Sequence, residues 1–396
     1  MVPSLDHWFI HSNRLSSNIK IGCNSYCVYF NQMQNAQLIS EYNCSLVILH
    51  FTVFIWGFTA ILGKLISSQA LTLVWHRMTI TFFVYLLLPT ARAQLKLTDR
   101  ATIATYFGVG LIVCGHWVSW YASIKYGNSA SISVACLGVV SFFSSILEPC
   151  LLNKKFSVID FASGLVVVAG VLCIYASLPA PPASANYDMA IGCGVLSAGL
   201  GSLFNVLNKK YHKLAPPLVM ATVEMGAGAL MLTILVVSLD REKTQWFPSF
   251  NINDVIAFDT STFQDGSWDL IWILILAVVC TNVTFYLSSF VLKDLSAFTV
   301  NLACNLEPVY GIILGALCFQ ENQALNKEFY FGAMVILAAV FANVVIGQIC
   351  GTTSTDSLQT DVKSAYSKSE TASNCEYEMV LASDVDADEE FGLQRE

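Results

Sequence analysis

Charged residues are scarce in this chain, and their scarcity excludes an ordinary soluble protein. Only 12% of the 396 residues are Asp, Glu, Lys or Arg, whereas soluble domains carry roughly 25%. Hydrophobic residues make up 55% of the chain. The composition therefore predicts a protein that crosses the membrane several times.

The sequence also lacks the patterns that enzyme chemistry requires. It has no arrangement of nucleophile and base, no nucleotide-binding loop and no metal-ligand spacing. The thirteen cysteines are an odd number, and most lie inside apolar runs, so they are expected to be free packing residues. We expect no enzymatic activity, cofactor, metal or nucleic-acid partner.

Excess negative charge is confined to the C-terminal end. Residues 350–396 hold eleven acids against three bases, which equals the whole net charge of −8. This Ser/Thr-rich tail, taken as residues 349–396, is expected to be disordered in the cytosol. Tyr377 to Val380 resembles a tyrosine-based sorting signal, so a sorting adaptor is a candidate partner. Residues 1–44 have no apolar core of signal-peptide length and are expected to be a disordered cytosolic lead-in.

Ten apolar segments lie between these ends, each close to the roughly 20 residues that cross a bilayer. The expected spans are Ser45–Ile66, Ala70–Thr90, Ala101–Ile124, Gly127–Leu151, Val158–Ser177, Met189–Asn208, Leu214–Ser238, Leu270–Leu292, Ser296–Phe319 and Phe329–Gly347. A linker at 179–188 separates five spans at 45–178 from five at 189–348. The long link at 240–269 mixes aromatic and acidic residues and predicts a small helix outside the membrane.

The two sets of five are expected to be copies of one unit. A gapless shift of 168 positions superimposes identical residues, namely Lys125 on Lys293, Cys150 on Cys318, Phe161 on Phe329, and Gly164 on Gly332. Because five is odd, the second copy must enter the membrane upside down relative to the first. The predicted fold class is an all-α membrane protein, with ten transmembrane helices in a five-plus-five inverted repeat.

Basic residues in the links predict the orientation, because cytosolic links carry an excess of Lys and Arg. With the N-terminus inside, the inner links hold nine bases: Arg92, Lys96, Arg100, Lys154, Lys155, Lys209, Lys210, Lys213 and Lys293. The outer links hold four. We therefore expect both termini in the cytosol, with the plasma membrane and an endomembrane as alternative locations.

Two motifs carry a resemblance to a known family. Trp56-Gly57 to Gly63-Lys64, followed by Trp75-His76-Arg77, resembles the beginning of an EamA domain. Asn305-Leu306-Glu307-Pro308 to Gly315, followed by Glu321, resembles the end of one. The chain is thus similar, over about residues 46–347, to the drug/metabolite transporter superfamily.

This resemblance implies a ten-helix carrier of small polar metabolites, often driven by protons or by exchange. The first half departs from the family pattern. It has Asn153-Lys154-Lys155 where family members usually have an acid, which Glu321 preserves in the second half. A shared role of that acid in gating is therefore in doubt in the first half.

Three charged residues lie near the middle of expected spans, where a charge costs roughly 2.5 to 3.5 kcal/mol. Arg77 and Glu224 occupy comparable places in the second and seventh spans, and Glu307 lies in the ninth. Arg77 and Glu224 are expected to form an ion pair across a cavity. Either the pair locks the two halves together, or Arg77 binds an anionic group of the substrate and Glu224 is released.

Two prolines follow acids, in Glu148-Pro149 and Glu307-Pro308. Each proline removes a backbone donor and frees a carbonyl four residues earlier, which makes a polar patch. The 168 shift does not superimpose these two Glu-Pro pairs, so they are not equivalent positions. Glu307 is the candidate for proton coupling or substrate contact, and Glu148 for a cytosolic gate; otherwise both are packing acids.

An aromatic cluster in the third span predicts a pocket wall. His116 and Trp120 are four residues apart, as are Trp117 and Tyr121, so they form two adjacent helix faces. Such a wall could shield a flat or cationic solute; the alternative is an ordinary core. Asn305 either lines the cavity or bridges helices.

Lys64 ends the first span. It is expected to extend its ammonium outward to the membrane surface, with substrate binding as the alternative.

The sequence therefore predicts a secondary transporter with a small-molecule substrate, coupled to protons as one option. The alternatives are an exchanger of organophosphates or nucleotide-linked sugars, and a membrane scaffold or receptor that signals through its tail. A homodimer is left open.

Overall fold

The computed structural model describes residues 42–178, 180–239, 245–295, 300, 303–304 and 306–350. Every regular element among them is helical. The chain divides into two compact units, residues 1–339 and 340–396, and the second contributes only the end of one helix to the described part. The predicted sorting signal at Tyr377 to Val380 lies outside the described residues.

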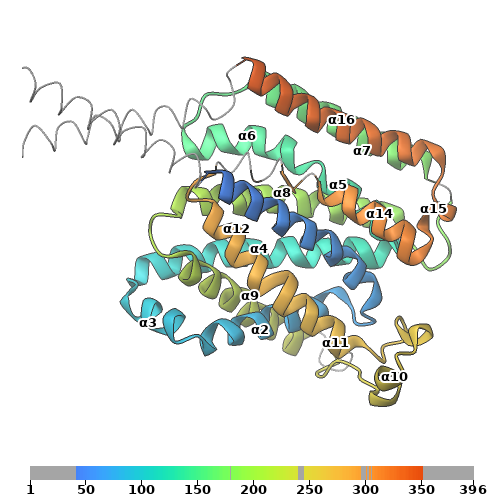
Figure 1. The fold of residues 1–396 in the computed structure, drawn as a ribbon, viewed down its shortest axis with the longest axis horizontal. Helices are drawn as coiled ribbons and strands as arrows, with labels where there is room; N and C mark the ends of the chain where they lie inside the picture. The colour runs from blue at the N-terminus through green and yellow to red at the C-terminus, as the bar shows by residue number, and fades with distance from the viewer. Residues whose placement is uncertain are drawn as a thin grey trace, which may run out of the picture. The chain divides into compact units, whose positions relative to one another are not determined.

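The first half of the chain begins with the helix Tyr42–Leu65, which precedes α2 in Figure 1. It continues with α2 (Ala70–Leu87), α3 (Pro89–Leu97), α4 (Arg100–Gly127), α5 (Ala130–Leu137), α6 (Val140–Leu152) and α7 (Val158–Ser177). Polar side chains start three of these helices, because Asp99, Ser129 and Ser157 each accept a bond from a backbone N–H group of the first turn.

The second half contains α8 (Tyr187–Tyr211), α9 (Pro217–Leu239), α10 (Ile252–Ala257), the short 3-10 helix η1 (Thr260–Thr262), α11 (Asp269–Leu274), the π-helix η2 (Ile275–Val283), α12 (Thr284–Val291), α14 (Glu307–Phe319), α15 (Glu321–Ala324) and α16 (Lys327–Cys350). α11, η2 and α12 follow one another without a break. α10 lies in the long link, where the sequence predicts a small helix.

Eight helices among the described residues are long and apolar enough to cross a membrane, and α14 is a shorter apolar helix. Large hydrophobic side chains remain exposed on these helices, as at Phe83, Leu172 and Leu230. Such a surface suits lipid and not water. The chain is therefore an integral, multi-pass membrane protein, while the count of ten spans stays a prediction.

A tight backbone turn, here called the backbone break, lies between α5 and α6 in the first half and directly before α14 in the second. Between α5 and α6, the Val139 N–H donates to the Cys136 carbonyl at 3.2 Å; before α14, the Leu306 N–H donates to the Ala303 carbonyl at 2.9 Å. Both bonds span three residues instead of four, and they lie 167 positions apart. Left-handed residues, Asn153 and Gln320, end α6 and α14 at the same spacing.

The predicted shift of 168 is therefore one residue too long in this segment. Glu307 corresponds to Val140 and not to Val139, because both are the first residues of the helix that follows the break. Glu148 still has no acidic counterpart, as predicted, since position 315 is glycine.

α4 runs between α8 and α9 and also packs against α2 (Figure 1). Small residues permit this close packing: a Cβ atom added to Gly110 would lie 2.6 Å from the Glu224 backbone. α2 packs in turn against η2. This arrangement brings one face each of α2, α4 and η2 together around Arg77.

Candidate functional site

A cavity of about 80 Å³ lies among the helices of the two halves. Its lining residues come from both halves: Trp56, Thr59, Arg77, His116, Trp117, Trp120, Leu137, Val140, Gly201, Phe204, Asn205, Cys280, Phe285, Ser288, Cys304 and Glu307. Five of the predicted site residues are among them, namely Arg77, His116, Trp117, Trp120 and Glu307. This volume is large enough for several water molecules.

Arg77 is fixed at the cavity wall by neutral partners. Its Nε donates to Thr281 Oγ1 at 2.7 Å, and one terminal nitrogen donates to the Tyr121 hydroxyl at 3.0 Å. The guanidinium carbon lies 3.8 Å from the ring centroid of Trp117, a cation–π contact. A guanidinium has five N–H donors, so these two bonds orient the group and leave its positive charge available to the cavity.

The π-helix η2 places Thr281 against Arg77. The Thr281 hydroxyl donates to the Leu276 carbonyl, five residues earlier, at 2.6 Å. π-helical turns are rare and occur often at functional sites. Thr281 is not evident from the sequence, because a single threonine in an apolar span gives no periodic signal.

Glu307 faces the same cavity from the N-terminus of α14. It is 8% exposed, and it follows directly after the backbone break. Its neighbours are Arg77, with which it interacts electrostatically, and the side chain of Thr59. Backbone N–H groups of a first helical turn also favour a carboxylate. Arg77 and Glu307 form no ion pair, so a guanidinium and a carboxyl group line the cavity without bonding to each other.

Aromatic rings close the sides of the cavity. Trp117 and Phe285 pack edge to face with centroids 5.8 Å apart, and Trp120 lines the wall beside them. Tyr121 is fully buried behind Arg77 and holds it in place. Of the aromatic residues in the predicted wall, Trp117 and Trp120 line the cavity, and the Arg77 guanidinium lies over the Trp117 ring.

His116 lines the cavity but is held by α8. Its Nδ1 lies 2.8 Å from the Ser197 carbonyl and 2.9 Å from the Ser197 hydroxyl. The ring also packs against Phe204, with centroids 5.3 Å apart. These contacts join α4 to α8 at the level of the cavity.

Glu224 does not pair with Arg77, which corrects the expected ion pair. Glu224 is completely buried, and its Oε2 accepts a bond from Asn208 Nδ2 at 3.3 Å. It is not among the cavity-lining residues. The comparable sequence positions were misleading, because Glu224 lies where α9 packs against α4, whereas Arg77 is bonded to η2 and α4.

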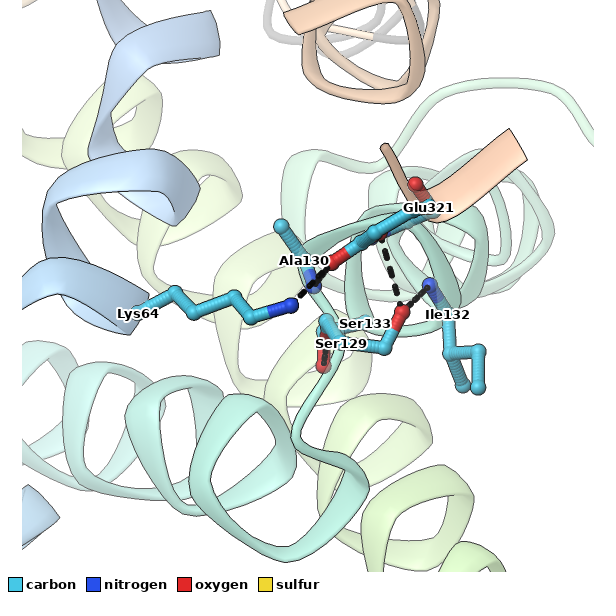
Figure 2. Close-up of polar contacts among 7 residues, drawn as sticks. Lys64, Ser129, Ala130, Ile132, Ser133 and Glu321 are labelled. Atoms are coloured by element: carbon cyan, nitrogen blue, oxygen red, sulfur yellow. Dashed lines mark hydrogen bonds and ion pairs between the residues drawn. The ribbon is translucent and has the colours of Figure 1, made fainter. Parts of the chain in front are cut away.

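Lys64 does not extend outward as predicted, because it forms a partly buried ion pair with Glu321. Their Nζ and Oε1 atoms are 2.7 Å apart, and the two side chains are 15% and 6% exposed (Figure 2). Glu321 also accepts bonds from the N–H groups of Ala130 and Ser131, both at 3.0 Å. The contact therefore ties together the first helix, the start of α5 and the connection between α14 and α16.

Glu321 stays ionised in this setting, outside the membrane-spanning helices. Burial alone would raise its pKa, but the Lys64 charge and the bonds from Lys64 and Ser131 more than offset that effect. The pKa consequently lies below its ordinary value of 4.5. The contact is thus a charged pair and not two neutral groups.

Two predicted residues remain apart from this arrangement. Glu148 lies near the end of α6, where its Oε2 atom pairs with Lys154 Nζ at 2.8 Å, and it does not line the cavity. Its role as a gate stays a prediction. Asn305 lies outside the described residues.

Comparisons with known proteins agree with this architecture. A sequence model described as the EamA-like transporter family matches residues 45–176 and 188–345. One solved structure, described as "Crystal structure of protein", matches with a TM-score of 0.56 and 13% identity, over 78% of this chain and 99% of that chain. At that identity the likeness concerns the fold alone. No curated protein matches significantly.

Proposed function

Because the chain belongs to the EamA-like transporter family, we propose that it is a secondary active transporter that moves a small polar metabolite by alternating access. The substrate carries an anionic group that binds Arg77. Glu307 carries the coupling proton or contacts a cationic part of the same molecule. The two family repeats are inverted five-helix units, and they rock around the cavity between them.

The observation that carries this proposal is the presence of two ionisable side chains, Arg77 and Glu307, at one cavity within the membrane-spanning helices. A charge inside the membrane is costly unless it is paired or lies in a hydrated space, and such charges typically mark substrate or ion pathways. Arg77 and Glu307 line the same space without forming an ion pair. A substrate that bridges them would neutralise both.

The backbone breaks support alternating access. In transporters with repeats, substrate sites lie beside interrupted helices, because the interruption supplies polar groups within the membrane. The breaks before α6 and α14 occur at equivalent places in the two halves, and Glu307 follows one of them. Val140 follows the other and also lines the cavity.

An exchanger of organophosphates fits this site less well. A phosphate group needs several positive partners, and Arg77 is the one Lys or Arg among the described lining residues. Lys64, the other cation that the sequence suggested, is neutralised by Glu321. A substrate with a carboxylate-like single charge matches the cavity better.

The proposal is tested by uptake into proteoliposomes that contain the full chain. Vesicles are offered a mixture of isotopically labelled small metabolites, with and without a pH gradient, and their contents are read by mass spectrometry. Glu307→Gln should abolish the response to the gradient, whereas Glu328→Gln, an exposed acid at the start of α16, should keep it. Equal uptake by both variants and the wild type would exclude a coupling role for Glu307.

The scaffold alternative makes a different prediction. A carrier should keep its flux when residues 351–396 are deleted, because the cavity lies in the helical region. A scaffold that acts through its tail would lose its activity in the same deletion. Absence of any uptake by the intact chain, together with a tail-dependent activity, would replace the transporter proposal.

A further inference from the structure

A second cavity, which shares no lining residue with the candidate transport site, is almost entirely apolar. Its volume is about 470 Å³, and its walls come from α2, α3, α4 and α9. Phe83 and Leu230 on its rim are 58% and 54% exposed. Because α2, α4 and α9 are long and apolar enough to cross the membrane, lipid chains and not water surround this part of the groove.

One end of the groove is formed by α3, a short helix that is basic on its exposed side. Proline at its first position starts α3 directly after α2 ends. Leu95 lines the groove, while Arg92 and Lys96, four residues apart, share one exposed side of the helix. α3 is thus an amphipathic helix of the kind that lies at a membrane surface.

The next helix places a third base at the same end. Arg100 begins α4, and Ile103 and Phe107 line the groove three and seven residues later on the same helical face. The distance along the helix from Arg100 to Phe107 is about 10 Å. This face of α4 therefore has a charged end followed by an apolar wall. A lipid has the same order, with a charged headgroup followed by an apolar chain.

These bases have no carboxylate partners within the described part of the chain. Asp99 is the acid beside them, and its side chain is occupied by the N–H groups of Ala101 and Thr102 at 2.9 and 3.0 Å. The bonds from Thr102 lower the pKa of Asp99, so this carboxylate is ionised and reduces the local positive charge by one. Three bases against one acid still leave an excess of positive charge at the end of the groove.

We propose that this groove is a binding site for an anionic phospholipid. One acyl chain lies along α9 between α2 and α4, and the phosphate-bearing headgroup contacts Arg92, Lys96 and Arg100. Basic clusters at the ends of transmembrane helices bind such headgroups. The excess of basic links predicts that this end faces the cytosol, where anionic lipids are concentrated. The site is separate from the transport cavity and depends only on the chain lying in a bilayer.

The charge requirement is tested by native mass spectrometry of the purified full chain with dioleoyl phosphatidylserine or dioleoyl phosphatidylcholine. The wild type should retain the anionic lipid preferentially. Arg92→Gln with Lys96→Gln and Arg100→Gln should lower that retention at least about tenfold. The matched control, Lys155→Gln with Lys293→Gln and Lys327→Gln, removes the same charge elsewhere and should retain the lipid. An equal loss in both triple variants would overturn the proposal.

The groove requirement is tested on the wild type alone, so the outcome does not depend on a variant that folds. Dihexanoyl phosphatidylserine, whose chains are too short to follow the groove, should compete poorly with the dioleoyl lipid, and inorganic phosphate should not compete. If the short lipid or phosphate competes equally well, binding is by charge only and the acyl-chain site is wrong.

Discussion

Glu307 begins α14 and Glu321 begins the short helix α15 that follows it, and the two carboxyl groups have different partners. Glu321 has a lysine partner at 2.7 Å and two backbone donors. Glu307 has Arg77 as an electrostatic neighbour but no ion pair, and it faces a cavity. Both acids are buried, so burial does not separate their roles.

The difference lies in what satisfies each charge. A charge that the protein itself pairs fully holds elements together, here the first helix, α5 and the α14–α16 connection. An ionisable group that the protein positions without an ion-pair partner remains available to a ligand or a proton. The comparison therefore favours a structural role for Glu321 and supports the proposed role of Glu307 in transport, and each role can be tested separately.

The largest effect is expected from Glu321→Gln, which leaves Lys64 without its anion. Loss of one partner of a buried ion pair costs about 3 kcal/mol, so the midpoint of thermal unfolding in detergent should fall clearly. Lys64→Met combined with Glu321→Leu should recover most of the loss, because it removes both charges. A double variant no more stable than the single one would show that the N–H groups of α5, and not Lys64, are the important partners.

Arg77→Lys tests the cavity that contains Glu307, and it should change transport without changing stability. A lysine keeps the charge but loses the planar group that bonds to Thr281 and Tyr121 and stacks on Trp117. We expect uptake into proteoliposomes to fall about tenfold or more while thermal unfolding changes little. Lys155→Arg, the reverse exchange at an exposed residue outside both proposed sites, is the control. A large loss of stability in Arg77→Lys would assign Arg77 to structure instead.

Acidification should weaken the Glu321 contact in a defined direction. The folded-state pKa of Glu321 is lowered, so the stability it contributes is complete above its ordinary value of 4.5 and is lost as the pH falls through the lower folded-state value. The difference in unfolding midpoint between wild type and Glu321→Gln should therefore be constant near neutral pH and shrink below 4.5. A difference that persists at low pH would mean that the charge is not what stabilises the contact.

The smallest effect concerns the backbone beside Glu321. Gln320 has a φ of 53°, a left-handed conformation that costs an ordinary residue about 1 kcal/mol relative to glycine. Gln320→Gly should stabilise the protein by about 0.5 to 1 kcal/mol in thermal unfolding. Asn153→Gly, at the equivalent end of α6, should stabilise it less, because asparagine adopts this conformation more readily. Equal effects would show that residue type at the cap does not matter.

Residues whose chemistry is unusual for their surroundings could be identified from the sequence. Arg77 and Glu307 stand out because charges are rare in apolar spans, and both line the cavity. The aromatic residues around Trp117 were recognised by their helical spacing. Thr59, Thr281 and Phe285 were missed, because threonine and phenylalanine are ordinary inside such helices.

Errors arose where partners come from distant parts of the chain. Equivalent positions in two repeats suggested that Arg77 would meet Glu224, but the close packing of α9 on α4 at Gly110 holds Glu224 elsewhere. Lys64 and Glu321 are separated by 257 positions, and no local pattern relates them. The change in spacing from 168 to 167 positions between the repeats likewise occurs near a backbone turn, and the matches between identical residues do not reveal it.

The amino-acid sequence by itself determined that this chain is a helical membrane protein with two related halves and ionisable residues in its spans. Hydropathy and internal repetition depend only on the order of residues along the chain. Only the tertiary structure decided which charges are paired and which face the cavity. That choice depends on distances between side chains far apart in the chain, and those distances are set by helix packing and by the breaks in the backbone.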